Sequence, residues 1–110
     1  MEININQEQG FQVLGLVGNF DTASAAEKEQ EFIDLVGDGS GKFLVDLAEV
    51  PFIASSGLRI LLKIAQAIRV GGGSLHLCSL NDTVREVFVI SGFDKILNVS
   101  ESKEQVFDSQ

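Results

Sequence analysis

Short apolar runs alternate with helix-length segments along this chain, and the alternation limits the possible fold more than any other feature. Residues 42–47 form a run that is too apolar for a surface strand and suits a central strand covered on both faces. Helical segments lie on both sides of this run, over residues 25–36 and from Leu58 to Val70. Strands separated by helices of this length pair in parallel through right-handed crossovers. We therefore expect an α/β fold in which a mainly parallel sheet of four or five strands is packed with helices.

The two ends of the chain supply the remaining elements. Residues 3–6 alternate between apolar and polar side chains, and the apolar run over residues 11–17 is expected to pair with them as a hairpin. The later expected elements are a strand over 74–79, a helix capped by Asn81 or Asp82 that runs to about 91–92, a strand over 96–99 and a helix over 101–107. With 110 residues and no linker or internal repeat, the chain is expected to form a single domain over residues 1–110.

The start of the first helix can be stabilised in three ways. Asp21 or Thr22 can act as the N-cap, or Ser24 can form a capping box with Glu27. The acidic side chains over residues 27–34 then form a solvated helix face or, alternatively, a surface that recognises a partner.

Charge is distributed unevenly along the chain. Its 8 Lys and Arg residues oppose 16 Asp and Glu residues, for a formal net charge of −8. Residues 1–51 carry the whole excess, with ten acids against two bases, whereas residues 52–110 hold six of each sign. Nucleic-acid affinity comes largely from Lys and Arg side chains that displace counterions from phosphates. We therefore expect no nucleic-acid partner and no binding to an anionic membrane surface.

We expect no cofactor, no metal ligand set and no membrane insertion. Cys78 is the only cysteine and stands among apolar neighbours, which is typical of a small buried residue. The first residues lack the basic and apolar regions of a signal peptide, and no apolar run approaches the roughly 18–20 residues that span a bilayer. The expected location is the cytoplasm.

The candidate catalytic residues have simpler structural interpretations. His76, the only histidine, alternates with leucines in a predicted strand, which favours a structural or surface role. The Ser55-Ser56-Gly57 sequence lacks the leading glycine of the G-x-S-x-G nucleophile motif. The glycines over residues 71–73 follow a helix and precede a strand, the reverse of the order in phosphate-binding loops, and are expected to cap the helix and form a tight turn. We therefore expect a protein that is not an enzyme.

The most informative segment is the start of the long apolar helix, where Ser55 and Ser56 precede Gly57. One interpretation is structural: either serine caps the helix, which contributes about 1 kcal/mol. The other is functional: an exposed hydroxyl at this end can be phosphorylated, because the helix dipole and free amides favour a phosphate there. Polar side chains at steps of four, three and three then form one narrow stripe along the helix: Arg59, Lys63, Gln66 and Arg69.

Five short segments, in order and at matching spacing, resemble the STAS domain family of anti-sigma factor antagonists. They cover nearly the whole chain: Leu16 to Asp21, Phe43 to Leu47, Phe52 to Leu58, Gly72-Gly73, and Val89 to Phe93. The resemblance implies the family's mixed, mainly parallel sheet packed with helices.

The resemblance also implies a function and a site. It implies a protein that binds an anti-sigma factor, a serine kinase of histidine-kinase-like ATPase fold, and so releases a sigma factor. The kinase would phosphorylate Ser55, with Ser56 as the alternative, and a PP2C-type phosphatase would reverse the reaction. The expected partner-binding residues are Asp21, Ser55, Ser56, Gly57, Arg59 and Lys63.

Ala54 motivates a second hypothesis, because many regulated members of the family have an acid before the first serine. The alternative is a STAS scaffold that is not phosphorylated, such as a subunit of a lipid-transport ATPase or of a signalling complex. A nucleotide or small-ligand pocket has no motif to support it.

Overall fold

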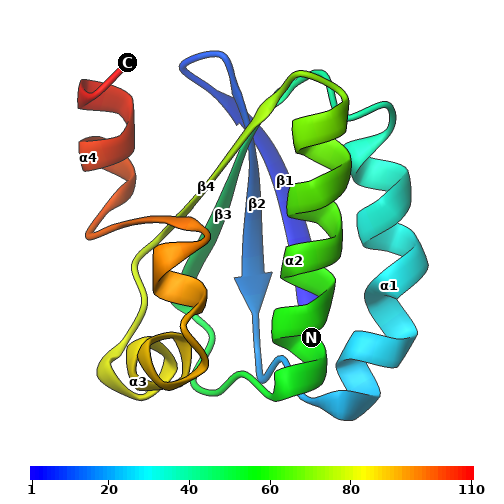
Figure 1. Cartoon of the computed structure of the whole chain (residues 1–110), viewed down its shortest axis with the longest axis vertical. Helices are drawn as coiled ribbons and strands as arrows, with labels where there is room; N and C mark the ends of the chain where they lie inside the picture. Colours follow the sequence, from blue (N-terminus) through cyan, green and yellow to red (C-terminus); the bar gives the residue numbers. More distant parts are fainter.

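Strands and helices alternate through most of the computed structural model, which describes all of residues 1–110 (Figure 1). The strands are β1 (Glu2–Glu8), β2 (Phe11–Val17), β3 (Lys42–Glu49), β4 (Ser74–Cys78) and β5 (Asn98–Ser100). The helices are α1 (Thr22–Val36), α2 (Ser55–Val70), α3 (Asp82–Ser91), the short 3₁₀ helix η1 (Phe93–Lys95) and α4 (Lys103–Asp108).

The five strands form one sheet in the order β1-β2-β3-β4-β5. The hairpin β1–β2 is antiparallel, with Glu2 opposite Val17 and Glu8 opposite Phe11, and the other three pairs are parallel. The predicted mixed, mainly parallel sheet with β3 at its centre is therefore confirmed.

The boundaries predicted for the last strand and the last helix are wrong by one or two residues. The predicted strand over 96–99 is β5 over 98–100, and the predicted helix over 101–107 is α4 over 103–108. The reason lies at Gly92, whose left-handed backbone (φ 78°) ends α3 and allows the unpredicted η1 to form before the chain becomes extended.

Most of the apolar side chains lie between the sheet and helices α1, α2 and α3. This core cluster of 22 buried residues includes Leu14 and Leu16 from β2, Val45 and Leu47 from β3, and Leu61 from α2. A smaller cluster on the opposite face of the sheet joins strand residues to Val106 of α4. Figure 1 shows α4, with the C-terminus, apart from the layer that α1 and α2 form.

Helices α1 and α2 lie side by side and run in the same direction, so both begin at the same end of the molecule (Figure 1). Parallel strands connected by right-handed crossovers produce this arrangement, because each helix returns the chain to the same edge. The fold thus brings two helix N-termini together.

Candidate functional site

The loops that precede α1 and α2 are hydrogen-bonded to each other. Phe20 and Ile53 form an isolated parallel bridge between them. The Phe20 amide donates to the Phe52 carbonyl at 2.9 Å, and the Ala54 amide donates to the Phe20 carbonyl at 2.8 Å. These bonds hold the start of α2 against the loop that precedes α1.

Helix α1 begins with a complete capping box. Asp21 is the N-cap, and its Oδ1 accepts the Ser24 amide at 2.9 Å, while the Asp21 amide donates to Ser24 Oγ at 2.9 Å. The Ser24 amide, and then its hydroxyl, stabilise the carboxylate and lower the pKa of Asp21. Of the three predicted alternatives Asp21 is correct, and the Ser24–Glu27 box is wrong because Ser24 already occupies the third helical position.

Helix α2 begins without any side-chain cap. The predicted capping by Ser55 or Ser56 is wrong, because α2 begins at Ser55, three residues before the predicted start at Leu58, and Ala54 occupies the N-cap position. The backbone holds Ala54 there: its amide is bonded to Phe20, and its carbonyl accepts the Leu58 amide at 3.1 Å. Both serines therefore lie inside the first turn, where the amides have no intrahelical partner.

The two serine hydroxyls have different surroundings. Ser55 is exposed. Ser56 is half-buried, and its Oγ donates to Thr22 Oγ1 at 3.2 Å, which links the first turns of α2 and α1. Ser55 is thus the more exposed of the two residues.

Gly57 is required by close packing. A Cβ atom at this position would lie 2.9 Å from the Phe20 carbonyl oxygen and 3.1 Å from Ile53 Cγ1. Real Cβ atoms essentially never lie closer than 3.0 Å to such a neighbour, so glycine allows α2 to approach the loop before α1. Gly57 is buried and offers no side chain to a partner.

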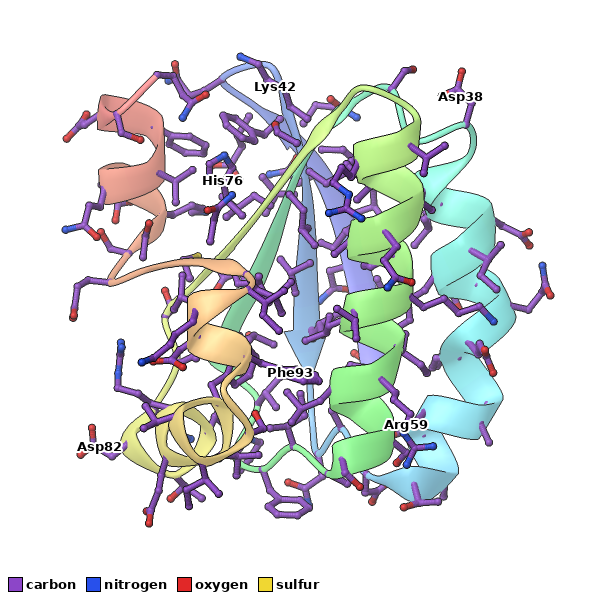
Figure 2. All side chains as sticks on the ribbon, viewed as in Figure 1. Asp38, Lys42, Arg59, His76, Asp82 and Phe93 are labelled. Carbon is purple, nitrogen blue, oxygen red and sulfur yellow. The ribbon has the colours of Figure 1, made fainter.

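A groove of about 420 Å³ runs between α1 and α2 beside these first turns. Its lining residues are Thr22, Ala25, Ala26, Glu29, Ser56, Arg59, Ile60 and Lys63. Lys63 Nζ lies 2.8 Å from Glu29 Oε2, so an exposed ion pair bridges the two helices. Figure 2 shows Arg59 at the lower end of α2, in the space that faces α1.

The fold brings together five of the six predicted binding residues. Ser55, Ser56, Gly57, Arg59 and Lys63 all lie in the first three turns of α2. Of these, Ser56, Arg59 and Lys63 line the groove, whereas Ser55 and Gly57 do not. The sixth, Asp21, directs its carboxylate into its own capping box and does not line the groove either.

The expected binding residues lack Thr22 and Glu29 of α1, although Thr22 was a capping candidate and Glu29 belongs to the acidic face that was offered as an alternative partner surface. They also lack Phe52 of the loop before α2. Thr22 and Glu29 lie on the side of α1 that faces the groove, and their spacing of seven residues is the signal that could have identified them. Phe52 is 43% exposed three residues before Ser55, and its place in a motif of small residues could have marked it.

The remaining sequence candidates have structural surroundings. His76 packs edge-on against the Phe11 ring, with the centroids 5.7 Å apart, and burial lowers its pKa. Cys78 is buried, as predicted, and burial raises the pKa of its thiol to about 11. Gly71 ends α2 and Gly72 has a positive φ of 84°, so the glycines form the predicted turn.

No cluster of three or more metal-binding side chains is present. None of the helices combines the length and the apolar character that crossing a bilayer requires.

A family model matches this chain, and several curated proteins are similar to it over most of its length. The family model is described as STAS domain and matches residues 2–106. BtrV of Bordetella bronchiseptica, named as a candidate anti-sigma factor antagonist, is 36% identical over 104 residues, which cover 94% of this chain and 90% of BtrV. The anti-sigma-F factor antagonist RsfB of Mycobacterium tuberculosis is 32% identical over 95 residues, 76% of this chain and 78% of RsfB.

Solved structures reproduce the fold at low sequence identity. A STAS domain protein of Planctomyces limnophilus, described as an anti-sigma-factor antagonist, superposes with a TM-score of 0.88 at 20% identity and covers 97% of this chain and 96% of that one. The Bacillus cell fate determinant SpoIIAA in its phosphorylated form gives a TM-score of 0.70 at 18% identity and covers 98% of both chains. These similarities concern the fold.

Proposed function

The chain belongs to the STAS domain family, and from this premise we propose that it is an anti-sigma factor antagonist. Residues 1–110 act as one STAS domain, and the protein works by binding rather than by catalysis. The names of BtrV and RsfB support this role, because both are similar to this chain over at least three quarters of its length.

The partner is an anti-sigma factor that is also a serine kinase of histidine-kinase-like ATPase fold. Its binding surface on this chain is the end of the molecule where α1 and α2 begin. Ser55, Arg59 and Lys63 are exposed there, and Phe52 adds an exposed aromatic side chain of the kind that is enriched at interfaces. Ser56, Gly57 and Asp21 set the shape of this surface through Thr22, Phe20 and Ser24.

One observation supports regulation at Ser55: its hydroxyl is exposed at a helix start that no side chain caps. In the proposed reaction the Ser55 oxygen attacks the γ-phosphorus of ATP, with loss of ADP and of the hydroxyl proton. The product carries about −1.5 to −2 charges at pH 7. The free amides and helix dipole favour a phosphate here, so the fold tolerates it, whereas a surface matched to a neutral hydroxyl does not. A PP2C-type phosphatase hydrolyses the phosphoserine and restores binding.

The test is phosphorylation by the cognate kinase with ATP, followed by peptide mapping in a mass spectrometer. We expect one phosphate on the wild-type protein, the same phosphate on Ser56→Ala, and none on Ser55→Ala. Modification that persists in Ser55→Ala and disappears in Ser56→Ala moves the assignment to Ser56. Persistence in both variants contradicts the proposal.

The binding consequence is measured with Ser55→Asp. We expect a loss of affinity of about 1 kcal/mol or more, roughly fivefold, because a charge enters a matched interface. The exposed Ser40→Asp, at the opposite end of α1, is the matched control and should bind as the wild type does. Equal affinity of Ser55→Asp and wild type would refute an electrostatic switch.

Ala54 favours a second candidate function, a STAS scaffold that is never phosphorylated, in a lipid-transport ATPase or signalling complex. Neighbouring genes discriminate the two: a kinase or PP2C-like phosphatase supports the antagonist, and transporter subunits support the scaffold.

A further inference from the structure

The groove between α1 and α2 contains one cation without an acidic partner. Of its three charged lining residues, Glu29 and Lys63 neutralise each other across the groove. Arg59 is exposed and forms no salt bridge anywhere in the chain. In a protein of net charge −8, a free guanidinium in a groove is an available partner for an anion.

The position of Arg59 determines where that anion can be. Arg59 follows Ser55 by four residues, so the two side chains are neighbours on adjacent turns of α2. Side chains on a helix lean toward its N-terminus, which directs Arg59 over the turn that holds Ser55 and Ser56. Figure 2 agrees, because Arg59 lies beside the lower end of α2, close to where the helix begins. An anion that precedes a cation by four residues is also the more favourable order of such a pair.

We infer that a phosphate on Ser55 is bound by Arg59 of the same chain, so that modification removes the free cation of the groove while it adds negative charge. The inference rests on the proposed phosphorylation of Ser55. Arginine suits this role because its planar guanidinium can pair with phosphate through two parallel hydrogen bonds. Arg59 is then a positioning residue: available to an acidic group of the partner in the unmodified protein, and occupied by the phosphate in the modified one.

Phosphorylation would change the sign of the local charge at one end of the groove. Before modification Arg59 contributes one positive charge beside the neutral Glu29–Lys63 pair. A phosphate of about −1.5 to −2 charges turns this corner of the groove negative. A partner that presents a carboxylate to Arg59 therefore loses its ion pair and meets repulsion at the same time.

The experiment places phosphoserine at position 55 during translation, so that no kinase is needed, and follows its ³¹P resonance as a function of pH. The second pKa of phosphoserine is ordinarily about 6. Loss of the cation in Arg59→Gln should raise this pKa by roughly 0.2–0.4 units relative to the otherwise unchanged phosphoprotein, as expected for an exposed pair at this spacing. Arg59→Lys should retain part of the effect. Arg69→Gln, which removes the same charge at the far end of α2, is the matched control and should leave the phosphoserine pKa unchanged.

Equal phosphoserine pKa values in the Arg59→Gln and Arg69→Gln proteins would overturn the inference, since a general loss of positive charge would then account for any change. A selective effect of Arg59 that shrinks in 1 M salt supports it, because exposed pairs are screened. The phosphate is installed without a kinase, so this result is independent of the proposed function. Failure of the kinase to modify Ser55 contradicts the proposed function alone, and a missing Arg59 effect contradicts this inference alone.

Discussion

The N-termini of α1 and α2 lie side by side, but a side chain caps only the first of them. At the start of α1, Asp21 and Ser24 exchange hydrogen bonds of 2.9 Å. At the start of α2, Ala54 occupies the corresponding position and no side chain bonds to the first amides. At the start of α1 a side chain therefore satisfies a first-turn amide, whereas at the start of α2 no side chain caps these amides.

The comparison extends to the serine hydroxyls of the two first turns. The Ser24 hydroxyl accepts from the Asp21 amide and donates to the Asn19 carbonyl at 3.0 Å, and the residue is only 7% exposed. Ser55 is exposed. Two serines in equivalent turns therefore have different roles: Ser24 stabilises the fold, and Ser55 is accessible to another protein.

The largest effect on the free energy of unfolding is expected from Gly57→Ala, because the added methyl group pushes the start of α2 away from the loop before α1. The new Cβ would lie 2.9 Å from the Phe20 carbonyl oxygen, a backbone atom that cannot rotate away. We expect a net destabilisation of about 2 kcal/mol, because the overpacking outweighs the gain of up to roughly 1 kcal/mol from replacing glycine in a helix. Urea unfolding measures the change.

The control for Gly57→Ala is Gly15→Ala in β2. There the nearest atom to the new Cβ is the Asn4 carbonyl oxygen at 3.7 Å, an ordinary contact. A free energy of unfolding within about 0.5 kcal/mol of wild type is expected for this variant. If both variants unfold alike, the close approach of α2 to Phe20 does not exist in solution.

The next largest effect on stability distinguishes Ser24, in the first turn of α1, from Ser56, in the first turn of α2. Ser24→Ala leaves the Asp21 amide and the Asn19 carbonyl without their partner, which costs about 1–2 kcal/mol. Ser56→Ala removes only the 3.2 Å bond to Thr22 Oγ1 at a half-buried site, so about 0.5 kcal/mol or less is expected. Thermal unfolding of the two variants measures the difference. Equal losses of stability would mean that the serine hydroxyl stabilises the start of α2 as much as the start of α1.

The sheet and its connections could be predicted from the sequence because they depend on patterns several residues long. The apolar run of β3 and the helix-length segments on both sides of it require parallel pairing, and Asn81 caps α3 as expected. The end of the chain was placed less well, since η1 depends on the backbone of the single residue Gly92.

The site could be predicted in its position and not in its details. The sequence identified the start of α2, but it assigned the cap to a serine because serine is a favoured capping residue. Ala54 takes that position because of the hydrogen bond between its amide and the Phe20 carbonyl, a contact between residues far apart in the chain. Thr22 and Glu29 were not assigned to one groove for the same reason: a groove between two helices depends on how they pack.

A smaller effect is expected when α2 is given the cap that it lacks. Ala54 has the extended backbone of an N-cap residue (φ −89°, ψ 166°), so a serine there can bond to the first-turn amides without a change of conformation. We expect Ala54→Ser to increase the free energy of unfolding by about 0.5–1 kcal/mol. Ala23→Ser, in the first turn of the already capped α1, is the matched control and should change it by less. A neutral Ala54→Ser would indicate that the α2 amides already have partners in solution.

The smallest effect is the pH dependence of the capping box itself. Hydrogen bonds from Ser24 hold the pKa of Asp21 below its usual value of 3.8 in the folded protein. A group whose pKa is lowered by folding contributes stability above its unfolded pKa, and that contribution disappears as the pH falls through the folded pKa. Asp21→Asn keeps a good capping residue that cannot titrate. The stability of wild type relative to Asp21→Asn should therefore be constant above about pH 5 and decline toward pH 2.5. Asp38, whose pKa is also lowered by its bonds from Ser40, titrates in both proteins and cancels in the comparison.

The same measurement in a Ser24→Ala background should show a flatter profile, because the bonds that lower the pKa of Asp21 come from the hydroxyl as well as the amide of Ser24. A profile that is flat from pH 7 to pH 2.5 without this substitution would mean that the Asp21–Ser24 box is not formed in solution, and the contrast between the two helix starts would then disappear.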